Sequence, residues 1–268
     1  MSIASHLESV WFNTTSGQYL LEKEQALYDQ AVFDLFGFNA LQMGDLQMDL
    51  LRNSRIPNRF QSADVASTAF KHHLSCCDDF LPFADMSLDL LLLPHRLEFS
   101  ERPHQTLREA ARVMMPEGHL LISGFNPMSS WGAAARIKQW FSNNQTYPWN
   151  GDFIRLARLR DWLALLGFEV VSIQKCCHIP PFEQASWHRR LSFLDKMGER
   201  CGPRFGGIYF IVAKKRVVGM TAIKPNWKAN PLSSALIARQ PKSNTSQFCA
   251  GAILSNATPS KHKQKNDG

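Results

Sequence analysis

The chain has 268 residues, of which 44% are hydrophobic and 20% charged, as expected for a globular α/β domain. Its formal net charge of +7 points toward nucleic acid, but residues 223–268 alone hold seven Lys or Arg and one Asp, a net charge of +6. Residues 1–222 therefore carry a net charge of +1, which argues against a basic nucleic-acid groove on the folded part. The six cysteines lack CxxC spacing, and we predict no metal site.

Neither an export signal nor a membrane-spanning segment is visible. The first thirty residues contain five charged side chains, with no basic start that leads into an apolar stretch. The longest apolar runs, near residues 88–93 and 208–213, have the length of strands. We therefore expect a cytoplasmic protein without membrane contact.

The first half of the chain alternates between helical and strand patterns. Apolar residues at helical spacing predict a helix over residues 19–36, ended by Gly37, and a short strand over residues 38–43 follows. The run LDLLLL at residues 88–93 is typical of a strand buried on both faces of a parallel sheet. An amphipathic helix is predicted over residues 104–115.

The second half continues this alternation. Strands are predicted over residues 119–125, 168–173 and 207–214, and a helix over residues 156–166. Strands that alternate with helices of this length indicate βαβ units and a mostly parallel sheet.

A basic segment follows the predicted domain. Beyond residue 218, Pro, Ser, Asn, Lys and Gln dominate and hydrophobic periodicity disappears. Such a composition buries too little apolar surface to offset the entropy of ordering. We predict a domain over residues 1–222 and a disordered tail over residues 223–268, with weak nucleic-acid contact through its lysines as an option.

The stretch from Leu81 to Gly132 carries a motif with fixed spacing. An LPF sequence precedes the leucine-rich strand, an LRE sequence opens the next helix, and Pro and Gly precede the following strand; the matching residues are Leu81, Pro82, Phe83, Ser87, Asp89, Leu107, Arg108, Glu109, Arg112, Val113, Pro116 and Gly118. The stretch resembles the type 11 group of class I S-adenosylmethionine-dependent methyltransferases. The start of the chain resembles one uncharacterised bacterial branch of that group.

The resemblance implies a fold, a cofactor and a reaction. The fold is a Rossmann-like class I methyltransferase fold, with a mostly parallel seven-stranded sheet and helices on both faces. The cofactor is S-adenosyl-L-methionine, and the reaction is methyl transfer to an acceptor that the sequence does not identify. The resemblance places the cofactor at the carboxyl ends of three strands, near Gly44, near residues 75–79, and at Leu93, Pro94 and His95.

The glycine loop of the group, acid-x-G-x-G-x-G, is only partly present. Gly44 stands at the first glycine, but Gln42 occupies the acidic position, and Leu46 and Met48 replace the other two glycines. We expect these two larger side chains to crowd the space used by the amino-acid part of the cofactor, and therefore to weaken binding.

Several acids are candidates for cofactor binding. Asp64 lies about 20 residues past Gly44, the usual distance for the acid that binds the ribose, or it lies in an exposed loop. Cys77 stands where the group has the acid that contacts the adenine amino group. Asp78 and Asp79 follow it, and either substitutes for that acid after a one-residue shift or caps the following helix.

His95 and Glu98 follow the leucine-rich strand, where a base on the substrate side can sit. The alternative is that they are polar residues at a helix start. The sequence thus predicts an active methyltransferase. The alternative is a catalytically inactive protein of the same fold that binds or regulates, which Leu46 and Met48 favour.

Overall fold

The computed structural model describes residues 11–44, 48–62, 72–74, 76–141, 148–181, 190 and 206–216. The chain divides into two units, Met1–Gly219 and Met220–Gly268, and every described residue lies in the first. The predicted boundary after residue 222 and the predicted tail lie outside the described residues, so both stay predictions.

A mixed sheet of seven strands forms the centre of the fold, in the order β3-β2-β1-β4-β5-β7-β6. Its strands are β1 (Asn39–Met43), β2 (Asn58–Ser62), β3 (His72–Leu74), β4 (Leu88–Pro94), β5 (Met114–Phe125), β6 (Phe168–Cys176) and β7 (Ile208–Lys215). Strands β1 to β5 pair in parallel, whereas β7 runs antiparallel to both β5 and β6. The sheet has the seven strands of the expectation and is mostly parallel, but it is a mixed sheet because the last strand inserts antiparallel between β5 and β6.

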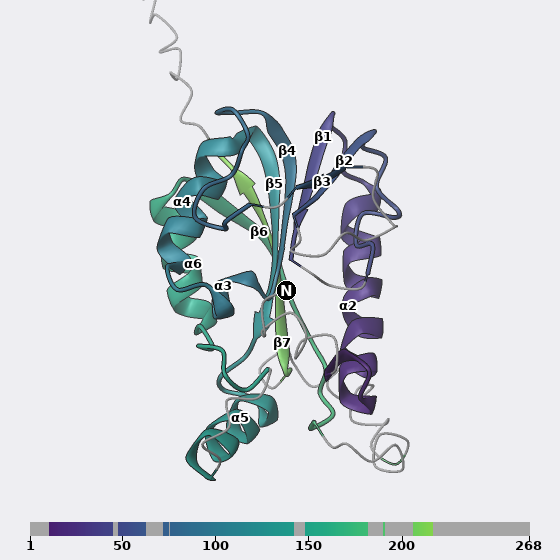
Figure 1. The fold of residues 1–268 in the computed structure, drawn as a ribbon, viewed down its shortest axis with the longest axis vertical. Helices are drawn as coiled ribbons and strands as arrows, with labels where there is room; N and C mark the ends of the chain where they lie inside the picture. Colours follow the sequence, from purple (N-terminus) through teal and green to yellow (C-terminus); the bar gives the residue numbers. More distant parts are fainter. Residues whose placement is uncertain are drawn as a thin grey trace, which may run out of the picture. The chain divides into compact units, whose positions relative to one another are not determined.

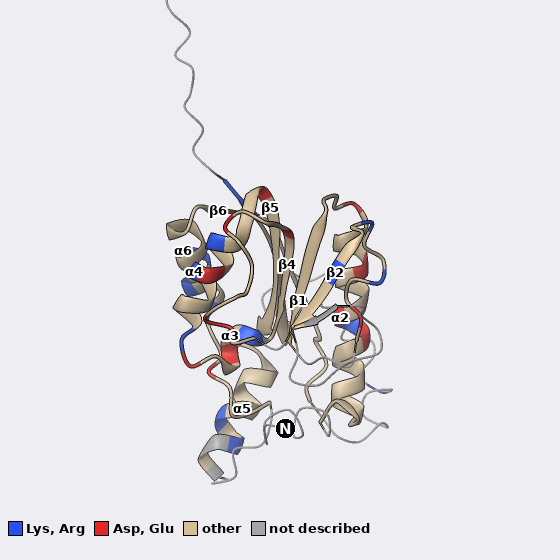
Figure 2. Ribbon diagram, turned by 45° about the horizontal axis from the view of Figure 1, so that its top comes forward, with Lys and Arg blue, Asp and Glu red and all other residues tan. Residues whose placement is uncertain are grey.

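Helices cover both faces of the sheet (Figure 1). Helix α2 lies on one face, and α4 and α6 lie on the other; the bounds are α2 (Thr15–Phe33), α3 (Arg96–Phe99), α4 (Pro103–Val113), α5 (Ser130–Phe141) and α6 (Leu156–Leu165). Lys, Arg, Asp and Glu are distributed over the helices and loops, whereas the central strands consist mostly of other residues (Figure 2). None of the helices in the described part of the chain is long and apolar enough to cross a membrane.

Strand β4 joins the two halves of the core. Leu90 and Leu92 pack into the cluster on the α2 side, whereas Leu91 and Leu93 pack into the cluster that contains α4 and α6 residues. Alternation of side chains along a strand explains this division, and the burial of each leucine contributes about 1.5–3 kcal/mol. The continuous apolar run in the sequence therefore forms the predicted strand, which is covered on both faces.

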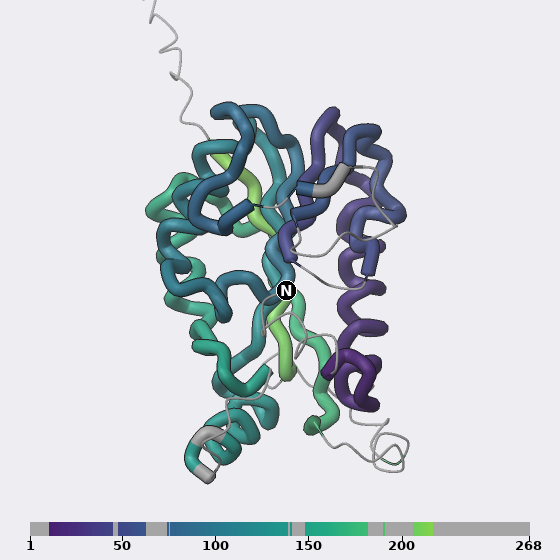
Figure 3. The backbone as a smooth tube through the Cα atoms, in the orientation of Figure 1, coloured from purple at the N-terminus to yellow at the C-terminus, as the bar shows by residue number. Residues whose placement is uncertain are grey.

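The chain winds outward from β1 in one direction and from β4 in the other. Figure 3 shows α2, β1 and β2 gathered on one side of β4, and the later helices on the other. Ligands of open α/β sheets bind beside such a reversal, outside the carboxyl ends of the strands. The neighbouring ends of β1 and β4 are therefore the first place to look for a site.

Two elements begin four or five residues earlier than the sequence predicts. Helix α2 begins at Thr15, because the Thr14 hydroxyl accepts a hydrogen bond from the Gly17 N–H and caps it, and it ends at Phe33. Strand β5 begins at Met114, five residues earlier than expected, because Leu88 of β4 pairs with Met114.

Candidate functional site

The carboxyl end of β1 is formed by a glycine. Gly44 has φ +109°, a region that L-residues rarely adopt, and its N–H donates to the Ser62 carbonyl at 2.9 Å. A Cβ atom at this position would lie 3.1 Å from Cδ of Arg96 and 3.7 Å from the Pro94 carbonyl oxygen. The missing side chain therefore leaves the strand end open toward β4 and toward a single flexible side chain.

That side chain, Arg96, forms a forked ion pair with Asp78. Its Nε lies 3.1 Å from Oδ2 of Asp78, and its Nη2 lies 2.7 Å from both carboxylate oxygens. The side chains of Arg96 and Asp78 are 31% and 14% exposed, so the pair is reachable from solvent but partly shielded. A charged pair with this geometry is stronger than a neutral hydrogen bond.

The residues before Asp78 cross the ends of the strands. Cys76 Sγ lies 3.0 Å from Ser62 Oγ at the end of β2, and burial raises the pKa of the Cys76 thiol. Cys77 is exposed. Asp79 turns toward α4, where it lies 3.5 Å from Thr106 Oγ1. Asp78 thus contacts the side chain beside Gly44, whereas Asp79 contacts α4.

The loop after β1 is held by a buried side chain rather than by a helix. The Gln42 amide donates to the Met48 carbonyl at 2.9 Å and accepts from the Leu50 N–H at 3.0 Å. Residues 48–57 contain no α-helix. The helix N-terminus that normally offers N–H groups to an anion after a glycine loop is therefore absent from this described stretch.

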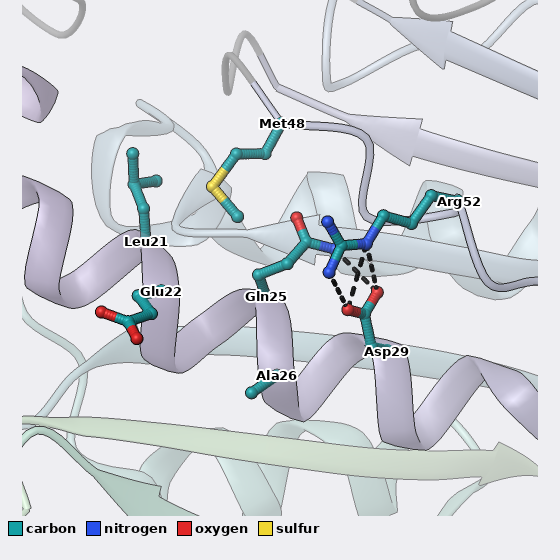
Figure 4. A pocket seen from close by; sticks show the side chains of 7 residues that line it. All are labelled: Leu21, Glu22, Gln25, Ala26, Asp29, Met48 and Arg52. Atoms are coloured by element: carbon teal, nitrogen blue, oxygen red, sulfur yellow. Dashed lines mark hydrogen bonds and ion pairs between the residues drawn. The ribbon is translucent and has the colours of Figure 1, made fainter.

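Met48 lies against α2. Its side chain packs on the α2-side core and lines an open groove of about 490 Å³, whose other walls are Leu21, Glu22, Gln25, Ala26, Asp29 and Arg52. Figure 4 shows the thioether directed toward α2, beside the ion pair of Arg52 and Asp29. The expectation that Met48 crowds the amino-acid part of the cofactor is therefore not supported, because the core on α2 takes up the side chain. Leu46 and Asp64 lie outside the described residues.

His95 is the first residue after β4 and is almost fully buried. It adopts a left-handed conformation with φ +50°, and its ring nitrogens lie 2.9 Å from Glu24 Oε1 and 3.0 Å from Glu98 Oε2. Burial by itself lowers the pKa of the imidazole, but the two carboxylates outweigh burial and raise it to about 10. His95 therefore holds its proton at neutral pH.

The histidine joins four elements into one buried polar cluster. Glu24 comes from α2 and Glu98 from α3, and Glu98 also accepts the N–H of Phe125 at the end of β5. Burial raises the pKa of Glu98, and its contacts with His95 oppose this. The second oxygen of Glu24, Oε2, has no hydrogen-bond partner in the described structure. The cluster fixes the end of β4 to both layers of helices.

This environment weighs against His95 and Glu98 as a substrate-side base. A protonated imidazole cannot accept a proton, and both side chains are about 98% buried or more. Their predicted role stays untested by a bound substrate. Sequence reasoning missed Glu24 because its partner lies 71 residues away. The available signal was a glutamate at helical spacing between Leu20 and Tyr28, on the face of the helix that is buried.

Comparisons with known proteins identify the family. A family model described as a methyltransferase domain matches residues 48–122, from the loop after β1 into β5. The uncharacterized protein YafS of Escherichia coli K12 is 33% identical over 187 residues, which cover 70% of this chain and 72% of YafS. The chain belongs to the class I methyltransferase-domain family.

Solved methyltransferases share the fold. An S-adenosylmethionine-dependent methyltransferase of Thermotoga maritima matches with a TM-score of 0.52 and 17% identity, over 74% of this chain and 97% of its own. One from Mesorhizobium loti matches with a TM-score of 0.52 and 12% identity, over 71% and 96%. The [4+2]-cyclase SpnF matches with a TM-score of 0.50 and 15% identity, over 73% and 80%. The likeness shows the fold alone, and a cyclase within it shows that this fold hosts more than one chemistry.

The methyltransferase family implies S-adenosylmethionine, and the end of β1 has room for the approach of such a ligand. Gly44 lacks the Cβ atom that would fill the approach, and the nearest atoms belong to the flexible Arg96 side chain. A ligand that reaches Gly44 therefore has to turn one side chain aside and need not move the backbone. Among the described residues, no three His, Cys, Asp or Glu side chains are grouped as metal ligands.

Proposed function

We propose that this chain is an S-adenosylmethionine-dependent methyltransferase that binds its cofactor beside Gly44 and transfers the methyl group to an acceptor. The observation that carries the proposal is the glycine with φ +109° at the carboxyl end of β1, next to the reversal of strand order. Backbone at this place is free of a side chain where this fold receives its ligand.

The cofactor contacts are assigned to residues around this strand end. Gly44 offers its backbone, and Asp78 and Arg96 offer charged groups within the same region. The end of β4, Leu93 to His95, forms the neighbouring wall, since the Pro94 carbonyl oxygen lies near Gly44. When bound, the cofactor supplies an electrophilic methyl group on a sulfonium centre.

The contribution of the protein to transfer is one of position. His95 is protonated and buried, so we do not assign it the role of the base that removes a proton from the acceptor. Its cluster with Glu24 and Glu98 fixes the end of β4. Beside this strand end, the acceptor has to approach the methyl carbon in line with the carbon–sulfur bond that breaks. Holding two reactants in a near-attack arrangement supplies a large part of the rate in such reactions.

A second candidate is a binding or regulatory protein of the same fold. It is favoured by the absence of a helix in residues 48–57 and by the Arg96 side chain that lies against Gly44. In this case the fold is retained without the cofactor.

Calorimetric titration of the full chain with S-adenosylmethionine and S-adenosylhomocysteine separates the two candidates. A methyltransferase binds both ligands with one site per chain. If millimolar ligand gives no heat of binding, the methyltransferase proposal is overturned, and the binding or regulatory protein is the candidate that stays.

If binding is seen, the acceptor is sought by transfer of a labelled methyl group. The label should pass from S-adenosylmethionine to a component of a cell extract with the wild-type chain. It should fail to do so with Gly44→Ala, whose new Cβ atom would lie 3.1 Å from Arg96 Cδ.

A further inference from the structure

The described residues that follow Gly44, 48–57, do not supply the usual positive potential for an anionic ligand group. In a glycine loop that leads into a helix, backbone N–H groups and the helix dipole attract a carboxylate or phosphate. Here residues 48–57 contain no α-helix, and the buried Gln42 amide already binds the loop backbone. A carboxylate brought to this edge therefore needs another partner.

Arg96 is placed to be that partner. It is the first residue of α3, its side chain passes within 3.1 Å of the position that a Cβ atom of residue 44 would take, and it is 31% exposed. The planar guanidinium presents two parallel N–H donors that match a carboxylate. The structure already shows this geometry, because Nε lies 3.1 Å from Oδ2 of Asp78 and Nη2 lies 2.7 Å from Oδ1.

We propose that Arg96 binds the carboxylate of the amino-acid portion of the cofactor, and that Asp78 takes this place when no ligand is bound. The inference rests on the proposed function, since it names the group that replaces the lost helix N-terminus at the same site. The exchange keeps the charge of the arginine compensated in both states. Asp78 is left without its partner after the exchange, and its 14% exposure gives it access to water.

The same exchange explains how a ligand reaches Gly44. The Arg96 side chain that lies against the glycine is held there by Asp78, so a ligand carboxylate that draws the guanidinium away also uncovers the strand end. Asp78 then lowers affinity, because the ligand has to compete with it for Arg96.

Two ligands that differ by the amino-acid portion test this proposal on the full chain. S-Adenosylhomocysteine carries the carboxylate, whereas 5′-methylthioadenosine has the same nucleoside and a thioether but lacks it. Arg96→Gln should weaken S-adenosylhomocysteine about tenfold to a hundredfold, the size of a lost charged hydrogen bond, and leave 5′-methylthioadenosine nearly unchanged. Asp78→Asn should tighten S-adenosylhomocysteine several-fold, because Arg96 loses its competing partner.

Arg216→Gln is the matched control. Arg216 also pairs with carboxylates, those of Glu117 and Glu169. It follows β7, which runs antiparallel to β5, and therefore lies at the amino ends of the parallel strands, away from Gly44. The affinity of this variant for both ligands should equal that of the wild type. Equal affinity of Arg96→Gln and wild type for S-adenosylhomocysteine would overturn the inference, and so would an equal loss for both ligands. Binding of neither ligand by the wild type would overturn the proposed function as well, so the two failures are distinguishable.

Discussion

Raising the pH should destabilise the protein through His95. The imidazole is buried between Glu24 and Glu98, and these carboxylates raise its pKa from 6.5 to about 10. A group whose pKa is raised on folding stabilises the folded state fully below its unfolded pKa. That stabilisation is lost as the pH rises from 6.5 through 10, because the unfolded chain releases the proton first.

The size of the effect follows from one proton. Between pH 7.5 and 9.5 the folded chain holds a proton that the unfolded chain lacks, so the free energy of unfolding falls by about 1.4 kcal/mol per pH unit. Over two units the loss is about 3 kcal/mol, which lowers the melting temperature of a domain of this size by about 6–12 °C. Tyr28 and Tyr209 face the same cluster, and burial raises the pKa of both well above 10, so they stay neutral in this range.

Thermal melts by circular dichroism at pH 7.5, 8.5 and 9.5 measure this slope. His95→Gln should reduce it by the amount of the lost proton, whereas His119→Gln should not, since burial lowers the pKa of His119 and the ring is neutral throughout. Glu24→Gln serves if His95→Gln fails to fold, and it should shift the alkaline loss to lower pH. Equal slopes in the wild type and in both cluster variants would refute the reasoning.

Two further predictions concern the strand end and the tail. Gly44→Ala should lower the free energy of unfolding by about 1–2 kcal/mol, because residue 44 has a positive φ, and it should also weaken the binding of S-adenosylhomocysteine. Gly167→Ala, at φ +80° with its Cβ position beside Arg216, should lower stability by a similar amount without loss of affinity. Denaturation and titration of the two variants compare these effects. Deleting residues 226–268 should leave the melting temperature nearly unchanged, because the segment has few apolar residues to bury; a drop of several degrees in a thermal melt would show that it packs on the domain.

Local pattern was sufficient for some strands and failed for others. β4 was predictable because a strand covered on both faces requires apolar residues at every position, as in the run from Leu88 to Leu93. β2 was not, since the letters around Phe60 are polar and mixed. It forms because main-chain pairing to β1 on one side and β3 on the other satisfies its backbone.

The site divides in the same way. Gly44 was identified from the sequence because the resemblance aligns it with the first glycine of the cofactor loop, and its φ of +109° explains why a glycine stands there. Asp78 and Asp79 could not be told apart by sequence. Adjacent residues point in different directions, and only the folded chain shows that one meets Arg96 and the other meets α4.

By itself, the sequence determined the class of fold and the end of β1, because periodic burial, turn chemistry and a spaced motif are properties of neighbouring residues. The tertiary structure alone decided the state of His95. Its pKa depends on Glu24, 71 residues earlier, and on the removal of all three side chains from water. The same holds for Arg96, whose place over Gly44 depends on how α3 begins beside the end of β1. Contacts between distant segments arise only when the layers pack, and no local pattern encodes them.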